Sequence, residues 1–313
     1  MIINGASISG VDIFGNPALY DFSTWTFTNG NATGNTGPST STLRALYNTT
    51  GNTWINNDAF FSTSNGIQLW TVPRSGSYTI TARGASSGMA NVGLGASISG
   101  TFSLNRGEII QVLVGQMGGN VNIFYSGGGG GSFVVRTPFN SNASILTIAG
   151  GAGGVSYRGG VGTGNVTPAQ GSADSTPGGT QYSKATGGGG GGSINSGGLN
   201  GANGSTQSSG WGAGGGGFFG IGGNNSAAFG GMSFTRGGRG GTGGASQGSG
   251  GFGGGGAADV SGGGGGGYNG GTSSGNNDAA GGGGSYNSGT SQTNTANANL
   301  GHGSVTITFV SAD

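Results

Sequence analysis

The chain has 313 residues, 84 of which are glycine; only 5% are charged and the formal net charge is +1. Glycine does not recur at every third position and there are only 6 prolines, which excludes collagen. The absence of cysteine excludes disulfides and zinc–thiolate sites. A nearly neutral chain lacks the basic field of a nucleic-acid binder. Its 15 Phe, 8 Tyr and 4 Trp distinguish it from charged, aromatic-poor disordered tails.

Residues 1–65 are rich in Asn, Thr and Ser and contain two short patterned stretches. TWTFT (24–28) places Trp25 and Phe27 on one face of a strand, and STLRALY (41–47) is the best candidate for a helical turn. We expect this region to form a small module separate from the rest of the chain. Its start, MIINGASISG, lacks the pattern of a signal peptide, and no apolar run approaches the roughly 18 residues of a membrane span. We therefore expect neither secretion through a leader nor insertion into a membrane.

Residues 66–150 carry the pattern of several short β-strands. SYTITA (77–82) and SISGTFSL (97–104) alternate with the period of two that is typical of strands with one buried face. IIQVLVG (109–115) is apolar on both sides, which predicts a central strand. Further candidates are IQLWTV (67–72), SFVVR (132–136) and SILTIAG (144–150). Short strands separated by turn signals predict an antiparallel sandwich or jelly roll.

Glycine tracts replace the strand pattern from residue 150 to about residue 295, and a strand then returns. GSVTITFV (303–310) places Val305, Ile307 and Phe309 on one face. A disordered Gly/Asn/Ser linker is the alternative that composition alone favours. A chain that comes back for a final strand instead predicts a structured insertion.

Polyproline II helices would explain the need for glycine in this insertion. Such a helix has three residues per turn and no internal hydrogen bonds, so its amides can bond to neighbouring helices when no side chain blocks them. Each bond returns about 0.5–1.5 kcal/mol, and ordering each residue costs about 1–2 kcal/mol. The bundle should therefore be stable only when it is clamped by the sandwich and packed by aromatic side chains. The candidates for this packing are Trp211, Phe218, Phe219, Phe252, Tyr268 and Tyr286.

Several segments that follow one another from residue 66 to 310 carry a family resemblance. GIQLWTVPRSGSYTITARGASSG (66–88), EIIQVLVGQMGG (108–119), SGGGGGGYNGG (261–271) and GHGSVTITF (301–309) resemble the glycine-rich extracellular domain of the anaplastic lymphoma kinase and leukocyte tyrosine kinase receptors. The resemblance implies a tumour-necrosis-factor-like jelly-roll sandwich with an inserted polyproline II bundle. Those receptors also carry cysteines, a membrane helix and a kinase, so we carry over the fold but not signalling.

These arguments together predict an all-β fold with almost no α-helix. The expected glycine-rich domain spans residues 66–313. Its β-sandwich would comprise residues 66–150 and 301–313, and its polyproline II bundle would comprise residues 150–300.

A second resemblance, in composition and tract layout, is to the glycine-rich adhesins at the tips of bacteriophage tail fibres. It implies a tail-fibre or tail-tip protein on the virion surface that recognises a host saccharide or outer-membrane component. Residues 1–65 would attach it to other virion proteins, and a homotrimer is compatible with this assignment. Loops between tracts would contact the receptor, with these candidates: Tyr182, Phe229, Phe234, Arg236, Arg239, Asn276 and Asn277. A purely structural virion protein is the alternative, and a signalling ectodomain is a third reading.

Catalytic, metal and nucleotide chemistry finds little support in the residues. His302 is the only histidine and sits beside the last strand, where a structural hydrogen bond is the usual role; Glu108 is the only glutamate. The aspartates are scattered without metal-ligand spacing. The glycine tracts lack the Lys-Ser/Thr ending of a phosphate loop. RGGRGG (236–241) and YRGG (157–160) resemble RNA-binding repeats, but two isolated copies in a nearly neutral chain are weak support. We expect no enzymatic activity, no cofactor and no nucleic-acid partner.

Overall fold

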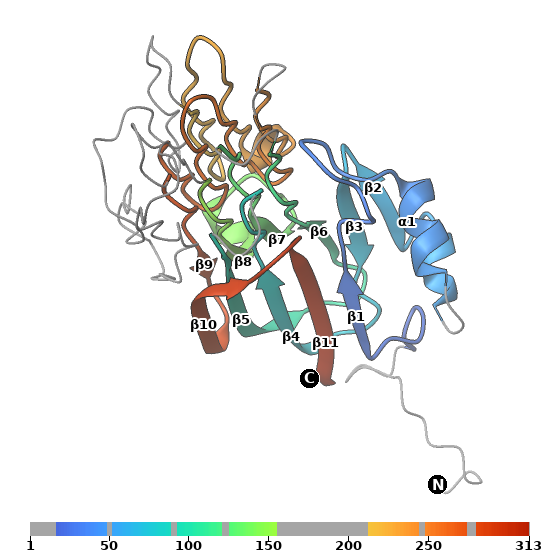
Figure 1. Ribbon diagram of the computed structural model, residues 1–313. Coiled ribbons are helices and arrows are strands. Elements are labelled where there is room, and N and C mark those ends of the chain that lie inside the picture. The colour runs from blue at the N-terminus through green and yellow to red at the C-terminus, as the bar shows by residue number, and fades with distance from the viewer. Residues whose placement is uncertain are drawn as a thin grey trace, which may run out of the picture.

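The computed structural model describes residues 17–48, 52–88, 93–120, 125–154, 212–243, 248–273 and 280–312. Its architecture is all-β, as predicted, with one α-helix, α1 (Thr40–Tyr47), and three short 3-10 helices, η1 (Thr53–Asn56), η2 (Asn142–Ser144) and η3 (Phe234–Arg236) (Figure 1). The strands are β1 (Thr24–Phe27), β2 (Phe61–Ser64), β3 (Ile67–Thr71), β4 (Gly76–Arg83), β5 (Gly95–Leu104), β6 (Ile109–Leu113), β7 (Ser132–Arg136), β8 (Ile145–Ala149), β9 (Tyr286–Asn287), β10 (Thr290–Asn299) and β11 (Ser304–Ser311).

The strands form two antiparallel sheets. One has the order β1-β11-β4-β5-β10, and the other has the order β2-β3-β6-β7-β8-β9. The central position predicted for residues 109–115 is confirmed, because β6 lies between β3 and β7. The tumour-necrosis-factor-like jelly-roll order stays a prediction.

One continuous hydrophobic core lies between the sheets. The alternating strands β4 and β11 both contribute side chains to it, including Ile80 and Ile307, which are fully buried. Trp70 of β3 is also fully buried, with its ring 5.1 Å from the ring of Phe22 and 6.2 Å from that of Phe27. The period-two pattern thus faces inward as the sequence predicts.

The opposite, outward-facing positions of the five-stranded sheet carry hydroxyl groups in register. Thr24, Thr308, Thr79, Thr101 and Thr290 form one row across all five strands. A parallel row pairs Thr26 with Thr306, Thr81, Ser99 and Thr293. Neighbouring hydroxyl oxygens lie 2.8–2.9 Å apart at three of these pairs. We call these two rows the hydroxyl face.

The six-stranded sheet is buried on both sides at β7 and β8. Val134 and Leu146 join the core between the sheets, whereas Phe133 and Ile148 face a second cluster. The second cluster is completed by aromatic residues from the glycine-rich part of the chain: Phe218, Phe234, Phe252 and Tyr268. These side chains therefore attach the glycine-rich segments to the sandwich.

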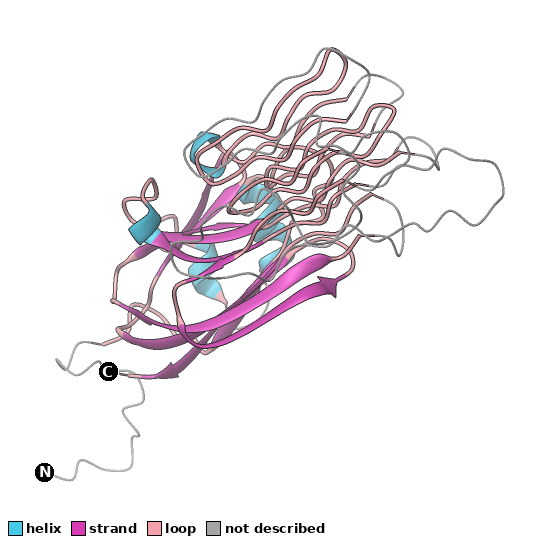
Figure 2. Cartoon of the chain, turned by 90° about the vertical axis from the view of Figure 1, so that its left-hand side faces the viewer, coloured by secondary structure: helices cyan, strands magenta, loops and turns pink. Residues whose placement is uncertain are grey.

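The glycine-rich segments continue from one end of the sandwich and lie side by side (Figure 2). Residues 84–88, 114–119 and 150–154 follow strands β4, β6 and β8, and residues 127–131 lead into β7. We use the name glycine bundle for these segments together with residues 212–231, 237–243, 248–273 and 280–285. Backbone hydrogen bonds connect segments that are far apart in the sequence, such as Gly128 to Gly256 (3.0 Å).

The neighbour that accepts a backbone N–H hydrogen bond within the glycine bundle repeats every three residues. Residues 263 and 266 donate to the carbonyls of 126 and 129, residues 264 and 267 to those of 213 and 216, and residues 265 and 268 to those of 281 and 284. These distances are 2.8–3.2 Å. The segment of residues 263–268 thus presents three faces to three neighbouring segments. Three residues per turn is the period of polyproline II, although that conformation itself stays a prediction.

The described part of the first 65 residues does not form a separate module, contrary to the expectation. β1 pairs with β11, and β2 pairs with β3. The predicted boundary after residue 65 falls inside the β2–β3 hairpin, whose two-residue turn is Asn65–Gly66 with φ of 51° and 82°. Asn-Gly is the preferred sequence of such turns because both central residues need positive φ. The attachment role predicted for this region stays a prediction.

The loop before α1 also connects this N-terminal region to the glycine bundle. The carbonyls of Gly34, Asn35 and Thr36 accept hydrogen bonds from Phe252 N, Gly240 N and Gln116 Nε2, at 2.8, 3.0 and 2.9 Å. These three consecutive carbonyls therefore accept hydrogen bonds from donors at the edge of the glycine bundle. The N-terminal region covers both the sandwich and the bundle.

The predicted span of the bundle, residues 150–300, was wrong at its C-terminal end. β9 and β10 lie within it, and β10 pairs with β5 at the edge of the five-stranded sheet. β10 reads TSQTNTANAN and is mostly exposed. A polar edge strand lacks the apolar alternation that identifies strands from sequence.

Candidate functional site

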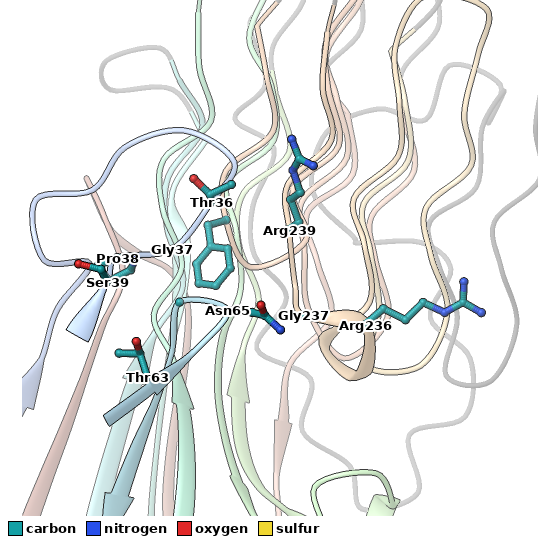
Figure 3. Close-up of a pocket in the computed structure, with 11 residues that line it drawn as sticks. Thr36, Gly37, Pro38, Ser39, Thr63, Asn65, Arg236, Gly237 and Arg239 are labelled. Carbon is teal, nitrogen blue, oxygen red and sulfur yellow. The ribbon is translucent and has the colours of Figure 1, made fainter. Parts of the chain in front are cut away.

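A pocket of about 590 Å³ lies where the N-terminal region meets the glycine bundle (Figure 3). It is bounded by the loop before α1, the β2–β3 turn, and the turn that follows η3. Its lining residues are Thr36, Gly37, Pro38, Ser39, Thr63, Asn65, Gly66, Arg236, Gly237, Arg239 and Phe252. Two of these, Arg236 and Arg239, are receptor-contact candidates from the sequence.

The Arg-Gly-Gly-Arg turn depends on its two glycines. Gly237 and Gly238 have φ of 94° and 63°, in the left-handed region that side chains disfavour. A Cβ at Gly238 would also lie 2.3 Å from Leu113 Cδ1 of the sandwich. The turn therefore packs closely on β6 and carries both arginines at the pocket, where their side chains point in different directions (Figure 3).

The other wall of the pocket comes from two loops of the N-terminal region that touch each other. A Cβ on Gly66 would lie 2.4 Å from Gly37 Cα, so only glycines allow this approach. Next to Gly37, Ser39 caps α1 by accepting a hydrogen bond from Thr42 N at 3.1 Å. Thr63 bonds Thr40 through their hydroxyls at 2.8 Å. This wall presents hydroxyl groups and the exposed Asn65 amide.

The two arginines of the pocket are exposed, and among the described residues neither side chain has an ion pair or hydrogen bond. Figure 3 shows both guanidinium groups pointing outward from the turn. Of the five other described arginines, four are engaged: Arg44 with Asp58, Arg136 with Glu108, Arg106 with the Pro17 carbonyl and Arg74 with Phe22 O and the Phe309 ring. The fifth, Arg83, is exposed at the end of β4, away from the pocket. None of the described residues that line the pocket is acidic.

The predicted contact residues do not form one site. Phe229 is exposed (53%) but does not line the pocket. The prediction for Phe234 was wrong, because this side chain is 3% exposed and stacks between Phe218 and Phe133, with both ring centroids 5.1 Å away. It anchors η3 and so fixes the turn that carries the arginines. Tyr182, Asn276 and Asn277 lie outside the described residues.

The residues predicted to pack the bundle lie at its junction with the sandwich. Phe218, Phe252 and Tyr268 are buried in the second cluster, and Phe219 and Tyr286 pack against it while partly buried. The Tyr268 and Tyr286 rings stack at 5.0 Å. Trp211 lies outside the described residues.

Sequence reasoning missed the N-terminal wall of the pocket, including Thr36, Ser39 and Asn65. These residues were assigned to a separate module and so were not combined with Arg236 and Arg239. The Asn65–Gly66 dipeptide, between FSTS and IQLWT, was the available signal, because it predicts a hairpin across the proposed boundary.

Other chemistry is sparse in the described part of the chain. His302 serves in a hydrogen bond, with Nδ1 accepting from Met117 N at 3.1 Å, and burial lowers its pKa. No group of three or more acidic or histidine side chains that could hold a metal ion occurs among the described residues. Within the same residues, no helix has both the length and the hydrophobicity needed to cross a bilayer.

Comparison with known proteins shows a partial similarity to a receptor. No protein-family model matches the chain. A stretch of 99 residues is 34% identical to the leukocyte tyrosine kinase receptor of Mus musculus. The match covers 30% of this chain and 11% of the receptor, so the chain spans only a small part of that protein's length. The chain is thus distantly similar to part of a leukocyte tyrosine kinase receptor.

Proposed function

We propose that this chain is a receptor-binding protein of a bacteriophage tail fibre or tail tip, and that it recognises a saccharide or outer-membrane component of the host surface. The observation that supports the proposal best is the pocket at the RGGR turn. Its walls belong to three segments held by the sandwich and the glycine bundle. A preformed site loses little conformational entropy on binding.

The chemistry of the pocket is suited to a polar ligand. Thr36, Ser39, Thr63 and Asn65 supply hydroxyl and amide groups, whereas the ring of Phe252 is buried beneath the pocket. Amides and hydroxyls of this kind bind saccharides by bonding to sugar hydroxyls. A volume of about 590 Å³ falls within the range of small-ligand sites.

The rest of the molecule is assigned to display and attachment. The glycine bundle, which we propose consists of polyproline II helices, would hold the pocket and the exposed Phe229 in fixed positions. The uncharged hydroxyl face would pack against other virion proteins or against further copies in a homotrimer. Residues 1–65 retain the proposed attachment role, although strands β1 and β2 within them belong to the sandwich rather than to a separate module.

A purely structural virion protein remains the second candidate, and the hydroxyl face is the observation that favours it. Its rows of Thr and Ser offer an extended, uncharged surface for protein contacts. A binding domain of a cell-surface receptor is the third, supported by the similarity to the leukocyte tyrosine kinase receptor.

Adsorption of the purified, fluorescently labelled protein to a panel of bacteria tests the proposal. Thr36→Trp places a large side chain at the exposed pocket edge, and Asn140→Trp places the same side chain in an exposed loop away from the pocket and from the hydroxyl face. We expect adsorption to a subset of strains that Thr36→Trp reduces and Asn140→Trp leaves unchanged. Absence of adsorption to every strain, together with virion imaging that locates the protein on the capsid shell, would favour the structural alternative.

A further inference from the structure

The pocket at the RGGR turn carries positive charge, and its described lining includes no acidic side chain. Arg236 and Arg239 are separated by two residues and both line it. Their guanidinium groups are free of partners among the described residues, whereas Arg44 and Arg136 form ion pairs with acidic side chains. Two unpaired arginines at one pocket are notable in a chain with only 9 Lys and Arg and a net charge of +1.

The remaining polar groups of the pocket do not offset this charge. Ser39, at its edge, is the N-cap of α1, and the first turn of that helix contains no acidic residue. The partial positive charge of a helix N-terminus therefore has the same sign as the arginines. Thr36, Thr63 and Asn65 are neutral.

We propose that this pocket binds a saccharide that carries a carboxylate or phosphate group, with Arg236 and Arg239 contacting the anion and the opposite wall contacting sugar hydroxyls. The inference rests on the proposed saccharide recognition and specifies its chemical class. Planar guanidinium groups bind carboxylate and phosphate oxygens with paired N–H donors. The long arginine side chains start at the pocket edge and are free to turn toward a ligand, because no described partner holds them.

A neutral sugar would make no charge-assisted bond with the two arginines, and a bare anion would make no contact with the hydroxyl and amide groups of the opposite wall. The combination of the two walls therefore predicts that charge and sugar hydroxyls are both needed. An RNA ligand is a separate reading of the Arg-Gly-Gly-Arg sequence. The binding experiment includes it as one outcome.

The test follows the arginine Nε–H signals of the full chain by ¹H–¹⁵N NMR during titration. The probes are trigalacturonate, glucosamine 6-phosphate, maltotriose, inorganic phosphate and oligouridylate. Arg236→Gln and Arg239→Gln identify the two relevant signals by their disappearance. Arg83→Gln is the control, since Arg83 is also exposed but lies at the end of β4 outside the pocket.

We expect the Arg236 and Arg239 signals to shift with trigalacturonate or glucosamine 6-phosphate, and much less with maltotriose or inorganic phosphate at equal concentration. The two acidic sugars distinguish a carboxylate ligand from a phosphate ligand. Each glutamine substitution should weaken binding about fivefold, which is typical of one exposed charge pair. Added salt should weaken it further, and Arg83→Gln should have no effect.

Equal shifts with maltotriose, or unchanged affinity in both arginine variants, would overturn the proposed anion specificity. Preference for oligouridylate would overturn it in favour of RNA. The adsorption experiment remains independent: adsorption that Thr36→Trp reduces but the arginine variants do not would leave the proposed function standing and remove this inference. Binding of acidic sugars without adsorption to any strain would support the anion site and contradict the proposed role in host recognition.

Discussion

Gly283 and Gly284 are adjacent in the glycine bundle, yet alanine should have very different effects at the two positions. A Cβ at Gly283 would lie 2.0 Å from Gly266 O and 2.4 Å from Gly266 C. At Gly284 the nearest atom would be Asn269 N at 3.4 Å, an ordinary contact distance. Neither glycine has positive φ, so space alone distinguishes the two substitutions.

The cost of Gly283→Ala follows from the hydrogen bonds around Gly266. The Gly266 carbonyl accepts from Gly151 N at 2.8 Å, and Gly266 N donates to Gly129 O at 3.0 Å. Moving this segment away by more than 1 Å would break both bonds, at about 1–3 kcal/mol together. Overpacking strain adds about 1–3 kcal/mol, and the lower entropy of the unfolded alanine chain offsets about 0.4–1 kcal/mol. The expected net loss is about 2–4 kcal/mol.

Thermal and urea unfolding of both variants measures the difference. We expect Gly283→Ala to lower Tm by about 5–10 °C, and Gly284→Ala to stay within about 2 °C of the parent chain. Two variants with the same stability, or a less stable Gly284→Ala, would refute the idea that inter-segment backbone contacts exclude Cβ atoms at specific faces of the bundle.

Three further outcomes follow from the described contacts. Phe234→Ala should destabilise the fold by about 3–5 kcal/mol because it empties a stacked core position, whereas Phe229→Ala should cost under about 0.5 kcal/mol at its exposed site; urea unfolding compares the two. Gly66→Val should separate the two loops that meet at Gly37 and Gly66, and it should strain the β2–β3 turn. The pocket should then be lost, which changed NMR shifts of the Arg236 and Arg239 side chains would report. His302 has a folded-state pKa below its usual 6.5, so the unfolded chain binds the proton first. Stability should therefore be full above about pH 6.5 and fall as pH decreases toward 5; His302→Asn should flatten this slope in urea unfolding, and an unchanged slope would assign it to other groups.

The sandwich could be predicted from sequence because its strands alternate between a buried and a solvated face. The predicted segments 77–82 and 97–104 lie within β4 and β5, and residues 132–136 coincide with β7. Gly150 also marks the point at which β8 gives way to the bundle. The alternation of apolar and polar residues is a local property of each strand, so it can be recognised in a single sequence.

The pocket could be predicted only in part because it depends on contacts between distant segments. Arg236 and Arg239 stood out as rare charges beside glycines, but the approach of Gly37 to Gly66 has no local signature. Phe234 was misassigned because an aromatic residue within a polar loop gives no sign of which way its ring points. Strand β10 was missed because its edge position removes the need for apolar residues.

The position of β11 between β1 and β4 has a consequence for how the protein is made. Among the described strands β1 pairs only with β11, so residues 24–27 cannot join a sheet until residues 304–311 have left the ribosome. Closing so long a loop late is slow compared with forming local contacts. Until then the N-terminal part of the core, including Phe27, lacks Val305 and Ile307 of β11, and a chaperone that shields it during synthesis should raise the yield of folded protein.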